Sequence, residues 1–337
     1  MAHQPYPAVC FVAGRSGGHI VPALTLAAEH KKNYPHDHVI FITTNTTLDK
    51  KITDNHPVID HIYYCDLAPF PGKALLKYPY FCMSLMRSVW HCIRILRRHK
   101  PQKIISTGGY IALPVCLAAT LLRIPIELYE LNALPGMATR ALAPLATTVA
   151  CCFKEAFPFF SKKKVRYATY PIRFTQSSAS PTSLPSHFSS TRKTILVIGG
   201  SQGSHFINTA INTWLAHTTC IATVQIIHQT GIAHLQACRD FYAHHNIPAL
   251  VFDYDDRIEQ YYRCADLVIC RSGAGSLFET LFFNKPCITI PLETKSTDHQ
   301  IYNARACART HPHLVSVIEQ QKLAQEPLLL DNFIRSL

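Results

Sequence analysis

The chain has 337 residues, of which 48% are hydrophobic and 16% are charged, and its formal net charge is +12. This length and apolar content are enough for two folded domains and exclude wholesale disorder. The thirteen cysteines form no Cys-x-x-Cys motif and the nineteen histidines form no HExxH motif. We therefore expect reduced thiols in a cytoplasmic protein, without a bound metal or other cofactor.

The first predicted unit is a buried strand at 7–13, a glycine-rich loop and a helix rich in alanine and leucine. The loop occupies residues 14–19 and reads Gly-Arg-Ser-Gly-Gly-His. Backbone N–H groups and the positive end of a helix dipole favour anions at such a loop. The sequence therefore predicts a phosphate-type site near the start of the chain.

Neither a secretory signal nor a transmembrane helix is expected. The apolar run at 9–13 is too short for the hydrophobic region of a signal peptide. The uncharged window 104–122 is interrupted by Ser-Thr-Gly-Gly at 106–109 and by Pro114. Those interruptions predict strand, loop and helix rather than a membrane span.

A stretch without any acidic residue separates Asp66 from Glu127, and its first part is rich in cations and aromatic side chains. We call residues 70–100 the basic–aromatic segment. This composition suits an anionic membrane surface, while a solvated helix face over a core stripe is the alternative. No recognition motif supports nucleic acid as a partner. The segment includes Phe70, Lys73, Leu75, Leu76, Lys77, Tyr78, Tyr80, Phe81, Arg87, Trp90, Arg94, Arg97, Arg98 and Lys100.

The first half then continues as alternating strands and helices. A Thr-Gly-Gly-Tyr turn at 107–110 follows a predicted strand, although taken alone it fits a tight turn as well as a ligand loop. The predicted strands after the first one are 39–43, 61–65, 103–106, 126–129 and 147–152.

Residues 175–192 are rich in serine, threonine and proline and lack periodicity, which is typical of a linker. We therefore expect an N-terminal domain at 1–174 and a C-terminal domain at 193–337. Strand–helix alternation on both sides of the linker predicts parallel sheets covered by helices. The predicted fold class is α/β, with two doubly wound, Rossmann-like domains facing each other across a cleft.

The second half repeats the arrangement of the first. A strand at 194–198 leads into Gly-Gly-Ser-Gln-Gly-Ser at 199–204 and a helix from about His205. Later, the stretch 270–279 passes from a strand directly into a helix, which offers free N–H groups to a diphosphate. Glu279 lies one turn inside that helix, where a carboxylate can accept hydrogen bonds from ribose hydroxyls. Further strands are predicted at 223–228, 249–252, 267–270 and 287–290.

Six motifs in the same order as in one known family span nearly the whole chain. They are Gly-x-Ser-Gly-Gly-His at 14–19, Thr-Gly-Gly-Tyr at 107–110, Glu-Leu-Asn at 130–132, Gly-Gly-Ser-Gln-Gly at 199–203, Cys-Arg-Ser-Gly-Ala at 270–274 and Asp-His-Gln-x-x-Asn-Ala at 298–304. Together they resemble the MurG family of glycosyltransferases, which have the two-domain GT-B architecture and need no metal.

The resemblance implies an inverting transfer of N-acetylglucosamine (GlcNAc) from UDP-GlcNAc to undecaprenyl-diphospho-N-acetylmuramyl (MurNAc)-pentapeptide. This reaction converts lipid I to lipid II in peptidoglycan synthesis, on the cytoplasmic face of the cell membrane. It also implies that the N-terminal domain binds the acceptor and the membrane, whereas the C-terminal domain binds the UDP-sugar.

On the donor side, the resemblance implies a diphosphate cradle at the start of the 274–282 helix, with Glu279 on the ribose. Gln300 would contact the sugar hydroxyls, and the backbone of Tyr254 would meet the uracil. The implied donor-binding residues are Arg173, Ser201, Tyr254, Ala274, Gly275, Ser276, Leu277, Glu279 and Gln300.

On the acceptor side, the resemblance implies that Ser16, Gly17 and Gly18 lie at the pyrophosphate or the transferring centre, with Tyr110 and Asn132 lining the cleft. The acceptor hydroxyl must lose a proton, and His19 beside the loop is the best candidate for the general base. A positioning role for His19 is the alternative. The helix start near Ser276 would stabilise the leaving UDP, so His19 and Glu279 form the candidate catalytic set.

Three alternatives stay open at this point. A UDP-GlcNAc 2-epimerase has the same architecture without a lipid acceptor, and a catalytically degenerate nucleotide-sugar-binding scaffold would bind the donor without turnover. Asp253-Tyr254-Asp255 also has the spacing of a metal–diphosphate motif, although this spacing arises easily by chance.

The chain departs from the family pattern at several positions. Arg15 and Ser16 replace a glycine and a threonine in the first loop, and Leu131 replaces a glutamine. Phe278 places a large side chain in the expected donor pocket. The chain also stops at Leu337, before the helices that usually brace the first domain in this family.

Overall fold

The computed structural model describes residues 7–175, 185–200, 203–255, 257–292 and 299–335. The chain divides into two compact units, Met1–Arg173 (unit 1) and Phe174–Leu337 (unit 2). Residues 176–184 of the expected linker lie outside the described part of the chain.

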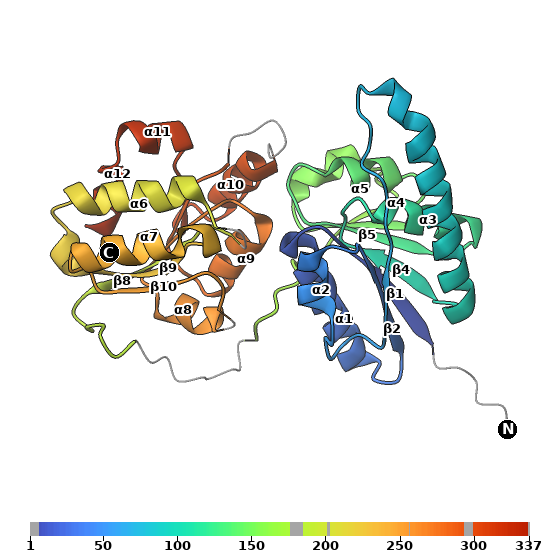
Figure 1. The fold of residues 1–337 in the computed structure, drawn as a ribbon, viewed down its shortest axis with the longest axis horizontal. Coiled ribbons are helices and arrows are strands. Elements are labelled where there is room, and N and C mark those ends of the chain that lie inside the picture. The colour runs from blue at the N-terminus through green and yellow to red at the C-terminus, as the bar shows by residue number, and fades with distance from the viewer. Residues whose placement is uncertain (1–6, 176–184, 201–202, 256, 293–298, 336–337) are drawn as a thin grey trace. The chain divides into compact units, whose positions relative to one another are not determined.

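Unit 1 is a parallel sheet with helices on both faces (Figure 1). Its seven strands lie in the order β3-β2-β1-β4-β5-β6-β7. The elements are β1 (Ala8–Val12), α1 (Gly17–Asn33), β2 (His38–Thr43), α2 (Thr47–Thr53), β3 (His61–Tyr64), η1 (Leu75–Lys77), α3 (Tyr78–His99), β4 (Lys103–Ser106), α4 (Ala112–Leu121), β5 (Ile126–Glu130), α5 (Met137–Leu142), β6 (Thr148–Cys151), η2 (Lys154–Phe159) and β7 (Val165–Tyr167).

The two faces of the unit 1 sheet have separate cores, because successive side chains of a strand point to opposite faces. Ala8, Cys10 and Val12 of β1 pack into the core that includes residues of α3 and α4. Val9 and Phe11 pack into the core that includes residues of α1. The uninterrupted apolar run of β1 is thus the pattern of a strand that is buried on both sides.

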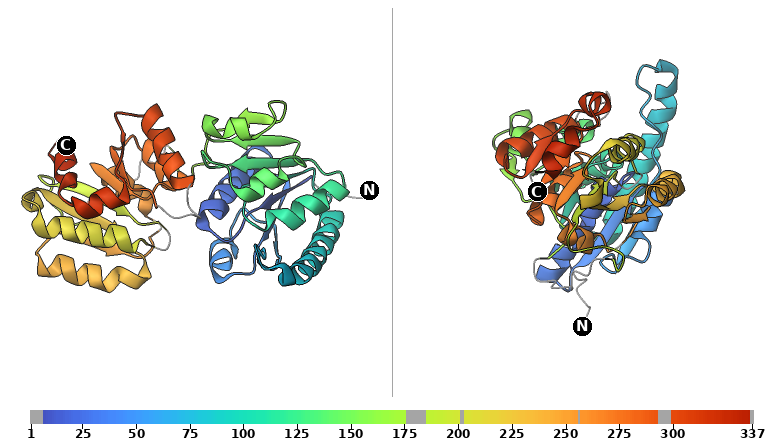
Figure 2. Two further views of the ribbon diagram at one scale, coloured as in Figure 1. Left: turned by 90° about the horizontal axis from the view of Figure 1, so that it is seen from above. Right: turned by 90° about the vertical axis from the view of Figure 1, so that its left-hand side faces the viewer.

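Unit 2 repeats this architecture with six parallel strands in the order β10-β9-β8-β11-β12-β13 (Figure 2). Its elements are β8 (Lys193–Ile198), α6 (His205–His217), η3 (Ile221–Thr223), β9 (Val224–Gln229), η4 (Ile232–His234), α7 (Leu235–His244), β10 (Ala249–Phe252), α8 (Ile258–Cys264), β11 (Leu267–Cys270), α9 (Ala274–Phe282), β12 (Cys287–Thr289), α10 (His299–Thr310), β13 (Val315–Val317), α11 (Gln320–Gln325) and α12 (Leu329–Ile334).

The predicted doubly wound α/β class is confirmed, and the eleven predicted strands all form within a residue or two of their expected bounds. The sequence analysis missed β7 and β13, which are edge strands of three residues each. Most of their side chains are only partly buried or exposed, so neither strand shows the continuous apolar run that identified the others.

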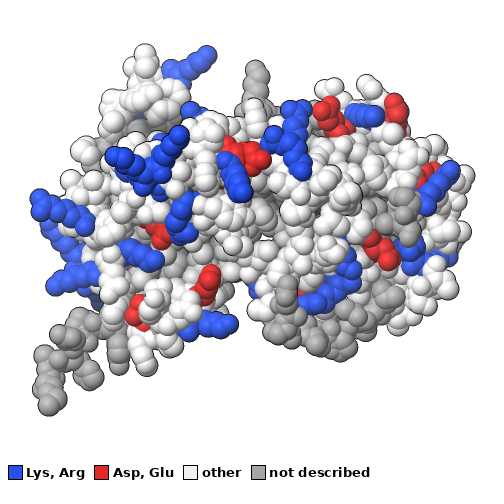
Figure 3. Space-filling model, turned by 180° about the vertical axis from the view of Figure 1, so that it is seen from behind, with Lys and Arg blue, Asp and Glu red and all other residues white. Residues whose placement is uncertain are grey.

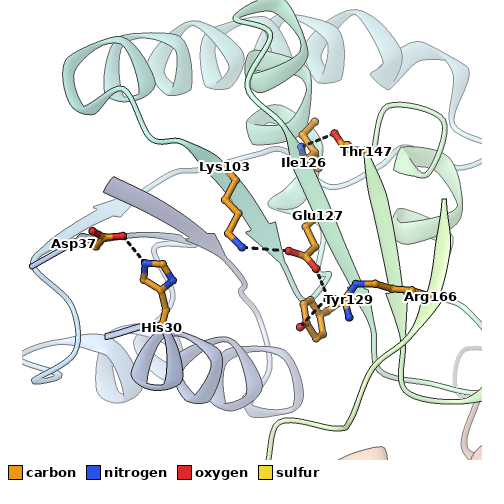
Figure 4. Close-up of polar contacts among 8 residues, drawn as sticks. All are labelled: His30, Asp37, Lys103, Ile126, Glu127, Tyr129, Thr147 and Arg166. Atoms are coloured by element: carbon orange, nitrogen blue, oxygen red, sulfur yellow. Dashed lines mark hydrogen bonds and ion pairs between the residues drawn. The ribbon is translucent and has the colours of Figure 1, made fainter. Parts of the chain in front are cut away.

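Charged side chains also tie strands of unit 1 together (Figure 4). Glu127 on β5 forms an ion pair with Lys103 on β4, with 3.5 Å between Oε2 and Nζ, and another with Arg166 on β7. Arg166 also donates to the hydroxyl of Tyr129 across 3.4 Å. These contacts fasten the short edge strand β7, which buries little apolar surface of its own.

Candidate functional site

Each sheet has one topological switch point, where the strand order reverses, and open α/β sheets bind ligands outside the carboxyl ends of the strands there. In unit 1 this point lies between β1 and β4, and in unit 2 between β8 and β11. The two loops at the first point are 13–16 and 107–110. Those at the second point are 271–273 and the glycine-rich loop, of which residues 199–200 and 203–204 are described. The four loops singled out in the sequence therefore occupy the two positions where this fold binds ligands.

The two loops of unit 1 lie against each other. A Cβ atom on Gly109 would come within 3.0 Å of the carbonyl oxygen of Gly14, and Gly109 has φ +88°. A Cβ atom on Gly108 would come within 3.2 Å of the His19 ring. The Thr-Gly-Gly-Tyr turn therefore needs both glycines so that it can pack against the first loop and His19.

His19, in the first turn of α1, has a defined proton arrangement. Its Nδ1 lies 2.8 Å from the backbone carbonyl oxygen of Thr107, and the Thr107 hydroxyl donates to the His19 carbonyl oxygen across 2.8 Å. Because a carbonyl oxygen only accepts, Nδ1 carries the proton and Nε2 of the neutral ring is the basic nitrogen. The geometry thus combines the two interpretations of His19: it locks the loop and presents a nitrogen that can accept a proton.

Gly17 and Gly18 leave the start of α1 open. A Cβ atom on Gly17 would meet nothing within 4 Å, and one on Gly18 would meet only the Ser16 hydroxyl at 3.8 Å. Glycine in a helix costs about 0.5–1 kcal/mol relative to alanine, and packing within the protein does not require either residue. Close approach of a ligand to this backbone would account for both glycines.

Tyr110 and Asn132 lie at the carboxyl end of the same sheet, but their polar atoms contact the protein. The Tyr110 hydroxyl donates to the carbonyl oxygen of Ala68 across 2.8 Å. The Asn132 side chain donates to Glu130 Oε1 across 3.3 Å, and its backbone N–H donates to the same oxygen across 3.0 Å. Burial raises the pKa of Glu130, although these bonds and those from Gly136 and Thr139 favour its charged form. Tyr110 therefore holds the loop backbone at Ala68, while Glu130 holds the backbone N–H groups of Asn132 and Gly136.

In unit 2 the second glycine-rich loop is tightly packed at Gly203. A Cβ atom on Gly203, which has φ +77°, would come within 2.0 Å of the Thr230 carbonyl oxygen, so only glycine fits there. Ser201 and Gln202 lie outside the described residues. Ser204 caps α6, since its hydroxyl accepts from the Ile207 N–H across 3.3 Å.

Buried Arg271 joins the two loops at the second switch point. Its Nε donates to the Ser204 hydroxyl across 3.0 Å, and Nη1 donates to the Ile290 carbonyl oxygen across 3.2 Å and to Gln320 Oε1 across 3.0 Å. The guanidinium also lies 5.5 Å from the centre of the Phe206 ring. We did not assign a role to this arginine from the sequence, because its partners come from three separate segments.

The start of α9 is where the sequence analysis expects a diphosphate cradle. Gly273 is the N-cap and a Cβ atom on it would meet nothing within 4 Å, so the approach to the helix start is open. The α9 helix is nine residues long and begins at Ala274, with Gly275 and Ser276 half-buried and Leu277 buried. Its first N–H groups have no partner within the helix, which makes this end suited to an anion.

Glu279 lies on the second turn of α9 and is half-buried. Tyr262 on α8 donates to its Oε2 across 3.2 Å. Tyr262 is another functional candidate that the sequence did not indicate, since it occurs in a short helix with an ordinary core pattern.

The remaining described donor candidates are Gln300, Tyr254 and Arg173. Gln300 is in the first turn of α10, where its Oε1 accepts from the Leu292 N–H across 3.0 Å. Tyr254 is exposed after β10, and Arg173 is the exposed last residue of unit 1.

The Asp-x-Asp stretch already has protein partners. Asp255 accepts from Arg257 Nη2 across 2.7 Å and from the Tyr261 hydroxyl across 2.6 Å. The Arg257 bonds are the main reason why the pKa of Asp255 falls to about 2. Across the described ranges, no three or more histidine, cysteine, aspartate or glutamate side chains gather as a metal-binding group.

Comparison with known proteins identifies the family. Residues 9–151 match the glycosyltransferase family 28 N-terminal domain, and residues 194–330 match the family 28 C-terminal domain. The chain belongs to glycosyltransferase family 28.

Within family 28, the chain is similar to UDP-N-acetylglucosamine--N-acetylmuramyl-(pentapeptide) pyrophosphoryl-undecaprenol N-acetylglucosamine transferases. It is 32% identical to that of Myxococcus xanthus over 94% of this chain and 82% of the relative. It is 34% identical to that of Halothermothrix orenii over 90% of this chain and 84% of the relative. The chain is therefore a MurG-type member of family 28.

The fold agrees with this family assignment. The crystal structure of Acinetobacter baumannii MurG superposes with a TM-score of 0.73 at 24% sequence identity, covering 98% of this chain and 90% of that one. The two doubly wound units are thus those of a GT-B glycosyltransferase. None of the described helices of this family 28 member combines the length and apolar character that a membrane span requires.

Proposed function

We propose that this chain transfers GlcNAc from UDP-GlcNAc to pyrophosphoryl-undecaprenol-linked MurNAc-pentapeptide, with inversion at the anomeric carbon. The observation that carries the proposal is the likeness to transferases of this activity at 32% and 34% identity over at least nine-tenths of the chain. The loops at the two switch points also suit a UDP-GlcNAc-dependent hexosyltransferase. Both substrates of this reaction, the donor and the acceptor, carry a diphosphate that such loops can bind.

Unit 2 is the proposed donor half. The open start of α9 receives the diphosphate, and Glu279 accepts hydrogen bonds from the ribose hydroxyls. The first-turn N–H groups at Ala274–Ser276 stabilise the charge that develops on the leaving UDP, and they do so without a metal ion. Gln300, Tyr254, Arg173 and Ser201 are the further donor-binding candidates in this proposal.

Unit 1 is the proposed acceptor half, with the pyrophosphate at the open start of α1. His19 then accepts the proton of the acceptor hydroxyl at Nε2, while the Thr107 carbonyl oxygen stabilises the protonated ring through Nδ1–H. The sugar oxygen forms its new bond to the anomeric carbon as the bond from that carbon to UDP breaks. Ser16, Gly17 and Gly18 supply the backbone that the acceptor approaches.

The exposed side of the basic–aromatic segment is the proposed membrane-contact surface. Leu76 is 97% exposed and Leu75 is 77% exposed in η1, and Trp90 is 61% exposed on α3. Figure 1 shows the start of α3 and the segment before it projecting beyond the rest of unit 1. The further large apolar side chains exposed in this segment are Phe70, Tyr80, Met83 and Met86.

Basic residues accompany these apolar side chains. Lys73 and Lys77 are exposed beside the leucines, and Arg87 and Arg94 are exposed on α3. Viewed from behind, basic side chains gather along the outer edge of unit 1 (Figure 3). Each cation near an anionic lipid surface contributes about 1 kcal/mol, so the segment would bring the enzyme to its lipid-linked acceptor on the cytoplasmic face of the membrane.

The test of the proposed activity is identification of the lipid product. Purified protein is incubated with UDP-GlcNAc and the lipid-linked MurNAc-pentapeptide, and the extracted lipid is examined by mass spectrometry. A gain of one N-acetylhexosamine on the acceptor supports the proposal. An unchanged lipid, with free UDP and a changed free sugar, would instead identify an epimerase.

A further inference from the structure

Asp49 on α2 is a buried carboxylate that none of the steps above uses. It has no exposed surface, and it lies in the first turn of α2, where its backbone N–H is capped by the Thr46 hydroxyl across 3.1 Å. Its carboxylate also contacts the first glycine-rich loop. Both Asp49 oxygens accept from the backbone N–H of Arg15, each across 3.1 Å.

The rest of the carboxylate is held by the end of β2. Asp49 Oδ2 accepts from the Thr43 hydroxyl across 2.8 Å, from the Thr44 N–H across 3.1 Å and from the Thr44 hydroxyl, while Oδ1 accepts from the Thr46 hydroxyl across 2.7 Å. Burial opposes ionisation, but these bonds outweigh it and hold the pKa of Asp49 below its ordinary value. A charged carboxylate that is held by Thr43, Thr44 and Thr46 thus also accepts from the backbone N–H of Arg15.

The residue that receives this contact has an unfavourable backbone. Arg15 has φ +68°, in the left-handed region, which side chains other than glycine rarely adopt. This is the position where the sequence places arginine in the pattern Gly-Arg-Ser-Gly-Gly-His. The Arg15 guanidinium is not what Asp49 binds: it lies 5.9 Å from the centre of the Tyr110 ring instead.

Neighbouring backbone leaves the loop little freedom to move elsewhere. A Cβ atom on Gly14 would come within 3.0 Å of Asp49 Oδ2, and on its other side the Gly14 carbonyl oxygen faces Gly109. Immediately after Arg15, Ser16 is the N-cap of α1, and its carbonyl oxygen accepts from the His19 N–H across 3.1 Å. The backbone angles at residue 15 therefore set where the start of α1, and with it His19, is placed.

We propose that Asp49 is a positioning residue for the transfer reaction: it holds Arg15 in its left-handed conformation and so orients the open start of α1 and His19. This role rests on the proposed function, because it acts through the acceptor loop. The contact with Asp49 also explains why the chain can have arginine at position 15, where the backbone angles favour glycine.

A double-mutant cycle tests this role. In Asp49→Asn we expect kcat with saturating acceptor to fall about tenfold, because the neutral side chain holds the Arg15 N–H more weakly. Glycine adopts the left-handed conformation without the Cβ cost, so in an Arg15→Gly background Asp49→Asn should lower kcat no more than about threefold. In an Arg15→Ala background, which removes the guanidinium but keeps the Cβ atom, the loss should again be about tenfold.

The control is Arg123→Gly. Arg123 is another arginine of unit 1 in the left-handed conformation, with φ +57°, so glycine removes the same Cβ strain there. In the Arg123→Gly background, Asp49→Asn should still lower kcat about tenfold. Equal losses in the wild-type, Arg15→Gly and Arg123→Gly backgrounds would overturn the proposal, because Asp49 would then act only on the general stability of unit 1.

A second measurement needs neither activity nor a substitution at Asp49. In the wild-type protein the Arg15 amide should exchange its hydrogen at least about a hundredfold more slowly than the Gly17 amide, which lies in the open first turn of α1. Exchange of Arg15 as fast as that of Gly17 would overturn the proposal. If the wild-type protein transfers no sugar, the proposed function fails, and this comparison still decides whether Asp49 holds Arg15.

Discussion

The hydroxyl of Tyr262 donates a hydrogen bond to Glu279 Oε2 across 3.2 Å. Tyr262 is fully buried, and its ring stacks on Phe283 with centroids 5.2 Å apart. Phe174, the first residue of unit 2, packs against the same two rings, at 6.3 Å from Tyr262 and 5.2 Å from Phe283. A rigid aromatic cluster therefore fixes one oxygen of the carboxylate that we assign to the donor ribose.

We predict that Tyr262→Phe raises the KM for UDP-GlcNAc about tenfold and changes kcat much less. A hydrogen bond to a charged group contributes about 1.5–3 kcal/mol, and without it Glu279 is free to turn away from the ribose. Steady-state kinetics at saturating acceptor measure the effect. The matched control is Tyr261→Phe, which removes a hydroxyl from Asp255 instead. Equal changes in KM in both variants would contradict the assignment of Glu279.

His19→Gln distinguishes a base from a purely positioning residue. Glutamine can still donate to the Thr107 carbonyl oxygen but cannot accept the proton of the acceptor hydroxyl, so kcat should fall about 10²–10⁴-fold. The KM for UDP-GlcNAc should change little, because we propose that the donor binds to unit 2. If His19→Gln retains most of the activity while His19→Ala loses it, His19 only positions the loop.

The membrane-contact surface predicts weaker binding to lipid when its apolar residues become acidic. The double variant Leu76→Glu and Trp90→Glu should bind phosphatidylglycerol vesicles at least about tenfold more weakly in co-sedimentation, since two buried apolar contacts are lost. Leu121→Glu is the control, because Leu121 is also 69% exposed in unit 1 but lies at the end of α4. If both variants lost vesicle binding equally, or if the double variant lost none, the proposed membrane-contact surface would be wrong.

The buried histidine of unit 2 predicts how stability depends on pH. His228 contacts the Tyr242 hydroxyl through Nδ1 at 2.7 Å and Asn208 Oδ1 through Nε2 at 3.1 Å, and burial lowers its pKa to about 3. In the unfolded chain its pKa is about 6.5. The unfolded state alone therefore gains a proton as the pH falls from about 6.5 to about 3, so stability is complete above this window and is lost within it.

Urea unfolding of unit 2 at a series of pH values measures this dependence. The contribution of His228 is at most about 1.4 kcal/mol for each pH unit in the window. His228→Gln, whose side chain does not titrate, should be less stable at pH 7.5 and should lose less stability on acidification than the wild type. An unchanged pH slope in the variant would show that other groups are responsible.

Much of this fold was predictable because strands buried on both faces produce continuous apolar runs, as in β1 and β8. The glycine-rich loops were predictable for the same reason, since they follow such strands directly. The short edge strands β7 and β13 carry no such run. Tyr262 and Asp49 were also missed, because neither stands in a recognisable motif and their partners Glu279 and Arg15 lie in other segments. Arg271 stands within the motif at 270–274, but its partners in other segments could be found only from the tertiary structure.

Tyr110 illustrates what a motif does not reveal. Its position beside the first loop was predictable, but its hydroxyl donates to the Ala68 carbonyl oxygen and so fastens the segment that leads into α3. Likewise the pattern at 14–19 identified His19, whereas only the contact with Thr107 shows which ring nitrogen carries the proton. The sequence was enough to locate the candidate functional residues. The tertiary structure was needed to show which ring nitrogen of His19 carries the proton and which contacts hold these side chains in place.

The most direct test of the central claim is UDP release from UDP-GlcNAc, measured with and without the lipid-linked MurNAc-pentapeptide and without added metal. We predict release only when the acceptor is present, and its collapse in His19→Ala and Glu279→Ala. Release that is independent of the acceptor would contradict the transferase assignment and indicate an epimerase. Tight binding of UDP without release under either condition would contradict it as well, and would leave a nucleotide-sugar-binding scaffold.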